Sequence, residues 1–318
     1  MGFDKPRVVV VGAGAMGGLF GGLLAEGGLD VTLVDTWAEH VAAIQAHGLR
    51  IVGVGGDRFV RVGATSDPAE IAAADVVLFQ CKAFANEAAA RCVRHLFTGG
   101  TVAISFQNGL GNEAVIGGVL GAQNVLGGLT AQAGLVEAPG VVRNGGDLPT
   151  TVGEMQGGLS DRAIAIAAAF TKHGLNTSAS ADIKRDKWKK LLGNVALGAI
   201  SAVTDMRSFE IMQVPELQET VFRSVDEAAT VAKAEGIDLD TAEAREVLMK
   251  LVDTTGGGTG ASKSSMREDI IRKRRTEIDT IHGAVTRLAR THGIATPTLD
   301  AMVALVKGLE VQNTRASS

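Results

Sequence analysis

From residue 7 to about residue 153, short apolar runs rich in β-branched residues alternate with Ala-rich helical patterns. The clearest of these runs are Arg7–Val11, Asp30–Val34, Asp75–Cys81 and Thr101–Phe106. Strands that alternate with helices along a chain form βαβ units. The pattern therefore predicts a mostly parallel sheet with helices packed against it.

The composition changes between about residues 124 and 153, where Gly, Thr and Val dominate and Pro139 and Pro149 interrupt the pattern. Such segments are typical of antiparallel strands joined by turns. We expect these strands to complete the sheet domain, and we expect a helix to follow at Ser160–Lys172.

After about residue 180 the strand pattern stops and long helical patterns take over. They lie at Asp182–Val203, Pro215–Glu235, Thr241–Val252, Arg267–Thr291 and Thr298–Leu309. A loop rich in Gly, Ser and Thr, Thr254–Ser265, precedes the fourth of them. The length of 318 residues exceeds the roughly 100–200 residues usual for one domain. We predict an α/β domain at 1–180 and an all-helical domain at 181–318.

Charge and composition narrow the choice of partners. The chain has 31 Lys and Arg against 35 Asp and Glu, and this net charge of −4 gives no general attraction to nucleic acid or to an anionic membrane. A compact basic run, Arg272–Arg275, lies among acidic residues, which indicates a solvated, charge-mixed helix. We therefore expect small-molecule partners.

The sequence also suggests a compartment. No signal peptide is expected before the first strand, and the longest uncharged stretch, Leu191–Thr204, is shorter than the ~20 residues needed to span a bilayer. The two cysteines are too few for a disulfide framework, and the histidines and cysteines show no metal-ligand spacing. We expect a cytoplasmic protein without a metal site, whose apolar helical domain is compatible with a homodimer.

A glycine motif follows the first strand and opens the next helix. Its residues are Gly12, Ala13, Gly14, Ala15, Met16 and Gly17. In a dinucleotide-binding turn, the first glycine allows the tight turn, the second lets the backbone approach a pyrophosphate, and the third lets the helix pack on the strand. Glycine-rich turns are common, but the strand before, the helix after and an acidic residue ending the next strand favour a Rossmann-type site.

That acidic residue, Asp35, bears on the choice between NAD and NADP. A carboxylate at this position accepts hydrogen bonds from a ribose 2′-hydroxyl and repels a 2′-phosphate. No basic residue follows it directly, although Arg58 or Arg61 could reach a phosphate from another loop. Asp35 could also be an ordinary residue at a strand end. The residues favour NAD over NADP.

Two further polar positions lie at the carboxyl ends of strands, where ligands bind in open α/β sheets. Lys82 follows the strand Asp75–Cys81, and Asn108 with Gly109 follows the strand Thr101–Phe106. An Asn-Gly pair is equally typical of an ordinary turn, because both residues tolerate positive φ. Position alone leaves both interpretations open.

The helix Asp182–Val203 has two distinct stripes. The apolar one is predicted to be core and consists of Trp188, Leu191, Leu192, Val195 and Ala199. The other contains Lys187, Lys190, Asn194, Gly198 and Ser201. Lys190 is the last charge before a long uncharged stretch, so it could donate to a substrate oxygen beside Asn194, but spacing alone favours a solvated lysine.

Glu277 is the unusual residue of the predicted helix Arg267–Thr291, where it falls on the apolar face with Ile281 and Leu288. A carboxylate there needs a partner. It could pair with Arg274 one turn earlier, or it could be an acid with a raised pKa at an interdomain cleft, close to the lysine. The residues leave these alternatives open.

Taken together, these motifs resemble the ketopantoate reductase (2-dehydropantoate 2-reductase) family, the NADPH-dependent reductases of the pantothenate and coenzyme A pathway. The resemblance spans nearly the whole chain. Its most specific segments are Gly12–Gly17, Cys81–Ala83, Asn108–Gly109, Lys187–Asn194, Ser264–Met266, Arg275–Asp279 and His292–Pro297. It implies a Rossmann domain followed by a helical domain, reduction of 2-dehydropantoate to pantoate, and Lys82 beside the cofactor.

The resemblance also implies a role for each matching residue of the site. Lys190 would hydrogen-bond the C2 ketone and supply the proton, while hydride arrives from the nicotinamide. Asn108 would hold the nicotinamide and the ketone together, and Glu277 would help orient the reacting oxygen. Asn194 would contact the substrate hydroxyl, and Ser265 would bind the substrate carboxylate.

Three positions depart from the family pattern. Gly198 and Ser262 stand where the family often has asparagines associated with the substrate's polar groups, and Asp35-Thr36 stands where NADP-using relatives carry a basic residue. These departures favour an alternative, a related dehydrogenase acting on another 2-oxo or hydroxy acid, with NAD. A non-enzymatic alternative is a nicotinamide-sensing regulator, which would not need Lys190 or Glu277.

Overall fold

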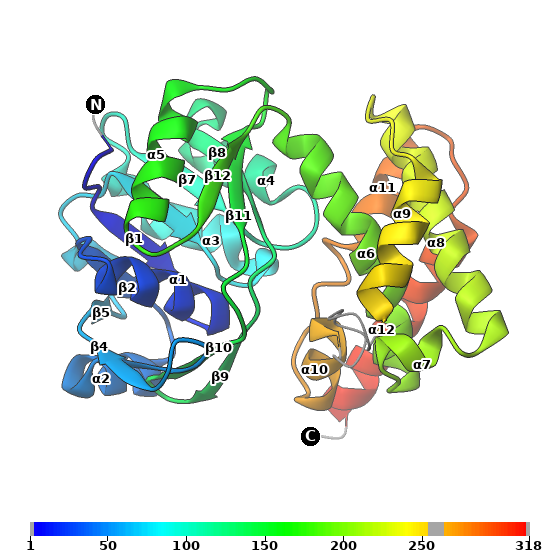
Figure 1. The fold of residues 1–318 in the computed structure, drawn as a ribbon, viewed down its shortest axis with the longest axis horizontal. Coiled ribbons are helices and arrows are strands. Elements are labelled where there is room, and N and C mark those ends of the chain that lie inside the picture. The colour runs from blue at the N-terminus through cyan, green and yellow to red at the C-terminus, as the bar shows by residue number, and fades with distance from the viewer. Residues whose placement is uncertain (1–2, 254–263, 316–318) are drawn as a thin grey trace. The chain divides into compact units, whose positions relative to one another are not determined.

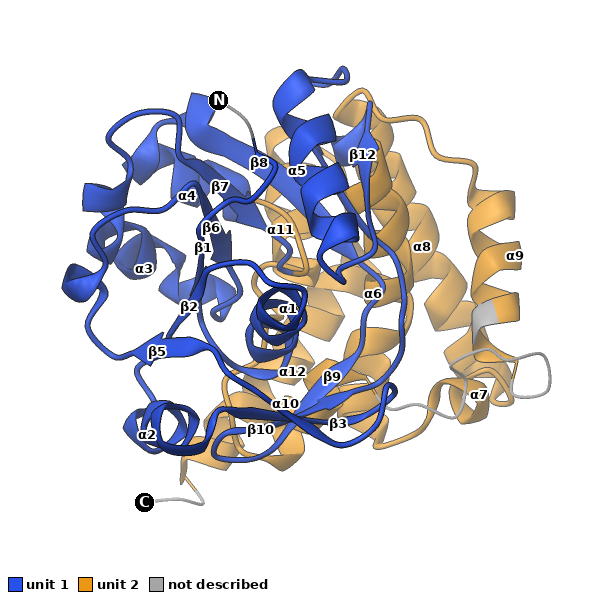
Figure 2. Ribbon diagram, turned by 60° about the vertical axis from the view of Figure 1, so that its left-hand side comes forward, with its two compact units in different colours: residues 1–107, 112–184 blue, residues 108–111, 185–318 orange. Residues whose placement is uncertain are grey.

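A computed structural model describes residues 3–253 and 264–315 of the chain. The chain forms two compact units (Figure 2). The first unit consists of residues 1–107 and 112–184, and the second of residues 108–111 and 185–318. The sequence predicts a single boundary at residue 180. The short segment 108–111 nevertheless belongs to the second unit, because it packs with the residues of that unit.

Among the described residues, the first unit contains an eight-stranded sheet with the order β12-β11-β8-β7-β6-β1-β2-β5 (Figure 1). Its strands are β1 (Val8–Val11), β2 (Val31–Val34), β5 (Gly63–Thr65), β6 (Val76–Phe79), β7 (Val102–Ser105), β8 (Val125–Thr130), β11 (Thr150–Glu154) and β12 (Thr177–Ser180). All neighbours pair in parallel except β8 with β11. The four predicted apolar runs form β1, β2, β6 and β7, and their residues are almost all buried, so the expected α/β class is confirmed.

A second, smaller sheet belongs to the same unit and has the order β4-β3-β10-β9. Its strands are β3 (Leu49–Gly53), β4 (Arg58–Val60), β9 (Gly134–Ala138) and β10 (Val141–Asn144). The antiparallel pairing expected between residues 124 and 153 is confirmed, but β8 and β11 join the large sheet while β9 and β10 pair in the small one. Strands β3 and β4 were not predicted from the sequence.

Helices cover the sheets of the first unit. They are α1 (Ala15–Glu26), α2 (Ala38–His47), α3 (Asn86–Cys92), α4 (Asn112–Leu120) and α5 (Asp161–Lys172), with short 3-10 turns at Pro68–Glu70, Ala83–Ala85, Arg94–Leu96 and Ala122–Asn124. Helix α1 packs on strands of both sheets. Apolar side chains of α1 and α5 form one core with the large sheet, and those of α3 and α4 form another.

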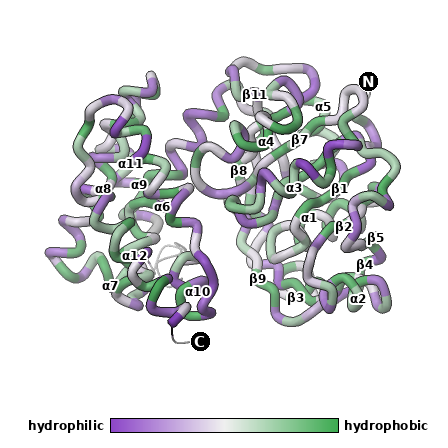
Figure 3. Tube along the Cα trace, turned by 180° about the vertical axis from the view of Figure 1, so that it is seen from behind, coloured by the Kyte–Doolittle hydropathy of each residue, from purple (hydrophilic) through white to green (hydrophobic). Residues whose placement is uncertain are grey.

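The second unit is helical throughout its described residues. Its helices are α6 (Ile183–Thr204), α7 (Ser208–Ile211), α8 (Pro215–Ala234), α9 (Thr241–Val252), α10 (Ser265–Ile271), α11 (His282–Thr291) and α12 (Pro297–Arg315). Hydrophobic and hydrophilic positions alternate along these helices (Figure 3). The predicted apolar stripe of α6 is confirmed, since its members from Trp188 to Ala199 are buried.

One prediction about the second unit is wrong. Residues Arg267–Thr291 do not form a single helix: α10 ends at Ile271, Lys273 adopts a left-handed conformation with φ 53°, and α11 begins only at His282. Glu277 therefore lies in a non-helical segment and not on a helix face. The helical periodicity could not reveal this break, because the segment is held by tertiary contacts that a continuous helix would not make.

No described helix is long and apolar enough to cross a bilayer. Within the same residues, no cluster of three or more His, Cys, Asp and Glu side chains is arranged to hold a metal ion.

Candidate functional site

The glycine loop between β1 and α1 has the close packing that its sequence predicts. Gly12 has a φ of +94°, and a Cβ built on it would lie 2.4 Å from the Cys81 nitrogen. A Cβ on Gly17 would lie 1.8 Å from the Gly12 oxygen. By contrast, no other described part of the chain comes within 4 Å of a Cβ built on Gly14. The loop is therefore tight where it meets the protein and open at the helix N-terminus, where a phosphate would approach.

The loop is also held by side chains from the next strand and helix. The Ala13 N–H donates to Asp35 Oδ2 at 2.7 Å, and the Trp37 N–H donates to Asp35 Oδ1 at 2.9 Å. His40 Nε2 lies 3.0 Å from the Ala13 oxygen, while the Gly140 N–H donates to His40 Nδ1 at 3.0 Å. Because Nδ1 accepts, Nε2 carries the proton and donates. Burial lowers the pKa of His40 and favours this neutral form.

His40 was missed by the sequence analysis. It is fully buried, and its partner Gly140 is 100 residues away, so no local pattern reveals it. Asp35 was predicted to touch the cofactor, and it also fixes the loop's backbone. Each of its oxygens accepts one backbone N–H, and a carboxylate oxygen can accept more than one hydrogen bond.

A buried polar network lies at the carboxyl ends of β6 and β7. Asn86 accepts from Gln107 Nε2 at 2.7 Å and donates to Asn112 Oδ1 at 2.9 Å. Gln107 Nε2 also donates to the Cys81 oxygen at 2.5 Å, and Ser105 Oγ donates to Gln107 Oε1 at 2.9 Å. Gln107 and Asn112 flank the segment 108–111. Asn86 therefore holds both ends of the loop that carries Asn108, a role with no signature in the sequence.

The loop 108–111 packs within the second unit. The Leu110 N–H donates to the Thr280 oxygen at 2.9 Å, and a Cβ on Gly109 would lie 2.2 Å from the same oxygen. Lys190, on α6, donates through Nζ to Asn108 Oδ1 at 2.9 Å. Three residues before Thr280 lies Glu277. The structure thus brings Asn108, Lys190 and Glu277 into one neighbourhood.

Lys190 has an unusual electrostatic environment. Burial and then the positive charge of Lys187 lower its pKa to about 8, and the negative charge of Glu277 acts in the opposite direction. Lys187 is itself only 6% exposed. The Lys190 ammonium is therefore the main form at neutral pH, but it can release a proton far more readily than an exposed lysine.

Two predicted substrate residues lie on α6 and at the start of α10. Asn194 is one helical turn after Lys190 on α6 and is partly exposed, and Ser265, the first residue of α10, is exposed. Ser264 caps α10 by accepting from the Arg267 N–H at 3.1 Å, and its Oγ also lies 3.2 Å from the Gly198 oxygen. These contacts join the start of α10 to α6.

The predicted site residues are divided between the two units. Gly12, Gly14, Ala15, Met16, Gly17, Asp35 and Lys82 belong to the first unit, and Asn108, Lys190, Asn194, Ser265 and Glu277 belong to the second. Ser262, where the sequence departs from the family pattern, lies outside the described residues. The roles assigned to these residues stay predictions.

Comparison with known proteins identifies the family. The model of the family "Ketopantoate reductase PanE/ApbA" matches residues 8–157, and the model of its C-terminal domain matches residues 182–310. The chain belongs to the ketopantoate reductase family. A 2-dehydropantoate 2-reductase of Halobacterium salinarum is 36% identical over 302 residues, covering 95% of this chain and 98% of the relative.

Two further relatives show the range of the likeness. A 2-dehydropantoate 2-reductase of Pyrococcus abyssi is 33% identical, covering 96% of this chain and 98% of its own. A D-mandelate dehydrogenase, solved with NADH and anilino(oxo)acetate, superposes with a TM-score of 0.92 at 28% identity, covering 97% of this chain and 99% of that protein. The family likeness therefore extends over both units.

Proposed function

We propose that this protein is a nicotinamide-dependent reductase that converts 2-dehydropantoate to pantoate. The observation that carries the proposal is the contact between Lys190 and Asn108 beside Glu277, in a chain that also has a complete dinucleotide-binding turn. Full-length relatives named 2-dehydropantoate 2-reductase support the choice of substrate. Pantoate formation would place the protein in pantothenate and coenzyme A synthesis.

The glycine loop fits a nicotinamide dinucleotide, because it is packed closely at Gly12 and Gly17 and open at Gly14, the residue that precedes α1. Gly12 to Gly17 would hold the pyrophosphate, Asp35 the ribose, and Lys82 and Asn108 the nicotinamide end. When bound, the reduced nicotinamide supplies hydride to the C2 carbonyl.

Lys190 has the chemistry that this reduction needs. A ketone that gains hydride develops negative charge on oxygen, and a positioned ammonium group stabilises that charge and donates the proton. Asn108 holds the Lys190 Nζ through its side-chain oxygen. Glu277 favours the ammonium form, Asn194 would contact the substrate hydroxyl, and Ser265 would bind its carboxylate.

We infer a preference for NADH. Asp35 places a carboxylate beside the loop, where it would accept from a ribose 2′-hydroxyl and repel a 2′-phosphate. Of the two arginines that could compensate, Arg58 is paired with Glu26 at 2.7 Å. Arg61 remains a candidate to bind a phosphate. The solved D-mandelate dehydrogenase carries NADH.

A second candidate is reduction of a 2-oxo acid with a bulkier substituent, and Gly198 favours it. The heavy atoms nearest to a Cβ built there are His282 Cε1 at 3.9 Å and Met266 Cε at 4.0 Å. Gly198 follows Lys190 and Asn194 at four-residue spacing on α6, and its missing side chain leaves space on that face of the helix. The apolar side chain of Met266 lies beside this space. The D-mandelate dehydrogenase in the comparison was solved with an aromatic 2-oxo acid analogue.

The test is the loss of reduced-nicotinamide absorbance with 2-dehydropantoate, using NADH and NADPH in parallel. We expect rapid oxidation that is faster with NADH and is abolished by Lys190→Ala, with cofactor affinity retained. A panel of branched and aromatic 2-oxo acids decides between the two candidates, and Gly198→Asn should shift the preference toward 2-dehydropantoate. Cofactor binding without turnover of any 2-oxo acid would instead support a sensing role and reject both candidates.

A further inference from the structure

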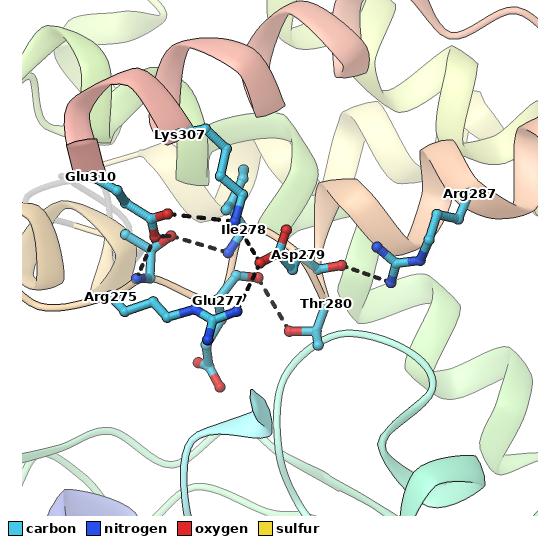
Figure 4. A network of polar contacts seen from close by, with 9 residues as sticks. Arg275, Glu277, Ile278, Asp279, Thr280, Arg287, Lys307 and Glu310 are labelled. Carbon is cyan, nitrogen blue, oxygen red and sulfur yellow. Dashed lines mark hydrogen bonds and ion pairs between the residues drawn. The ribbon is translucent and has the colours of Figure 1, made fainter. Parts of the chain in front are cut away.

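The segment that carries Glu277 is not helical, yet its neighbours are tightly fixed (Figure 4). The Glu277 carbonyl accepts from the N–H groups of Thr280 and Ile281, both at 3.1 Å. The Glu277 carboxylate points away from these contacts. This geometry fixes the backbone of Glu277, whose negative charge acts on Lys190.

Helix α12 holds the residue before Glu277. Glu310 Oε1 accepts from both the N–H and the Oγ1 hydroxyl of Thr276, each at 2.7 Å. Thr276 is 1% exposed, and its Oγ1 in turn accepts from the Ile278 N–H at 3.2 Å. Two charge-assisted hydrogen bonds to a buried residue are strong and directional, so Glu310 sets the backbone position of Glu277 from one side.

Helix α12 also holds the segment after Glu277. Lys307 Nζ lies 2.6 Å from Asp279 Oδ2 and 3.5 Å from Glu310 Oε2. Arg275 reaches the same Asp279 oxygen at 3.3 Å, and Arg287 donates to the Asp279 carbonyl at 2.9 Å. Lys307 therefore joins the contacts before and after Glu277 into one network on α12.

We propose that Glu310 and Lys307 are positioning residues that act on the reaction through Glu277. They lie on α12, touch the residues on either side of Glu277, and hold its carboxylate at the place from which it acts on Lys190. The kinetic test of this inference rests on the proposed function. No motif in the sequence singled out either residue, and their distance from Glu277 along the chain conceals the contact.

The decisive comparison is between Glu310→Ala and Glu310→Gln. Glutamine keeps a side-chain oxygen that can accept from Thr276, whereas alanine removes it. We expect Glu310→Ala to lower kcat about tenfold, since small displacements of positioned groups are costly, and to leave the cofactor Kd unchanged. It should also move the alkaline limb of kcat/KM down by roughly half a pH unit, because Glu277 would no longer favour the Lys190 ammonium. Glu310→Gln should restore most of both effects.

Asp300→Ala is a matched control on the same helix. Asp300 is a carboxylate of α12 paired with Arg290 at 2.6 Å, and its other side-chain partner is the Thr296 hydroxyl, so it lies outside the network around the segment 275–280. A purely structural role for α12 predicts that Asp300→Ala and Glu310→Ala lower the melting temperature alike and leave the alkaline limb in place. That result, or equal pH profiles for Glu310→Ala and the wild type, would overturn the proposal.

Hydrogen exchange of residues 275–281 provides a readout that does not need turnover. We expect faster exchange in Glu310→Ala and, to a smaller degree, in Lys307→Met, with protection regained in Glu310→Gln. Unchanged exchange would contradict the inference. If the wild type reduces no 2-oxo acid, the proposed function fails by itself, while the exchange data still decide whether α12 holds the Glu277 segment.

Discussion

At the scale of single residues, the site depends on groups whose charge is set by burial. Lys190 has a pKa lowered to about 8 by burial and by Lys187, and His282 has a pKa lowered to about 4 by burial. His282 Nε2 lies 3.1 Å from the Val195 carbonyl of α6. One group is poised to exchange a proton near neutral pH, and the other is kept neutral inside the second unit.

The pKa of Lys190 predicts the pH dependence of reduction. The ammonium form must donate the proton, so kcat/KM should be constant below about pH 8 and fall as pH rises through that value. Lys190→Arg should remove this alkaline limb, because arginine does not titrate in this range, while lowering kcat by about 100-fold. A pH–rate profile from pH 6 to about 10 measures both. An unchanged limb in Lys190→Arg would assign the titration to another group.

His282 predicts the acid sensitivity of folding. Its pKa falls from 6.5 to about 4 on folding, so the unfolded chain binds a proton between these values and the folded chain does not. Stability should therefore fall as pH drops from about 6.5 to 4, by roughly 3 kcal/mol from this group. His282→Gln should flatten that part of the curve, because an amide does not titrate in this range. The amide can still donate to the Val195 carbonyl, so the fold should persist. Denaturant unfolding at several pH values tests this, and a parallel decline in both proteins would contradict it.

At the scale of elements, irregular segments carry much of the site. Asn108 lies in the loop 108–111, and Glu277 lies between α10 and α11. Each segment is fixed by side chains from elsewhere, Asn86 in the first case and Glu310 in the second. Loops held in this way can combine a defined position with a backbone path that a helix or strand does not allow.

Asn86 should therefore matter for both stability and activity. Asn86→Leu would leave the Gln107 and Asn112 amides without their buried partner, at a cost of about 2 to 4 kcal/mol, and would loosen the loop that carries Asn108. We expect a lower melting temperature together with a lower kcat. Asn124→Leu is the control, because Asn124 donates to the Leu120 carbonyl at 2.8 Å, away from this loop. Equal kcat in the two variants at a temperature where both are folded would argue against a link to Asn108.

At the scale of the whole molecule, the first unit carries the glycine loop and Asp35, and the second carries Lys190, Asn194 and Ser265. Substitutions in the glycine loop should therefore weaken binding of the cofactor, and substitutions of Asn194 or Ser265 should weaken recognition of the oxo acid. This division follows from which unit each residue belongs to.

Gly14→Ala and Ser265→Ala test that division. Gly14 has a φ of −61°, which alanine accepts, and its Cβ would meet no described part of the protein, so the fold should persist while the phosphate's space is filled. We expect the NADH Kd to rise about tenfold or more, which is about 1.4 kcal/mol. Ser265→Ala should raise the KM for the oxo acid and leave the NADH Kd unchanged. Fluorescence titration and steady-state kinetics separate the two, and an equal loss of NADH affinity in both variants would contradict the division.

The sequence by itself determined the α/β class, the glycine loop and four of the five helices predicted for the second unit, because each depends on local spacing of apolar, glycine and polar residues. The apolar stripe of α6 was confirmed in this way. Family motifs, read from the same residues, also pointed to Lys190, Asn108 and Glu277 as the site.

Only the tertiary structure decided how those residues are held. Periodicity predicted one helix over Arg267–Thr291, but contacts from Glu310 and Lys307 on α12 accompany a break around Glu277. His40, Asn86 and the small sheet formed by β3, β4, β9 and β10 join residues that are distant along the chain. The lowered pKa of Lys190 also requires the tertiary structure. Helical spacing places Lys187 close to Lys190, but only packing buries Lys190 away from water.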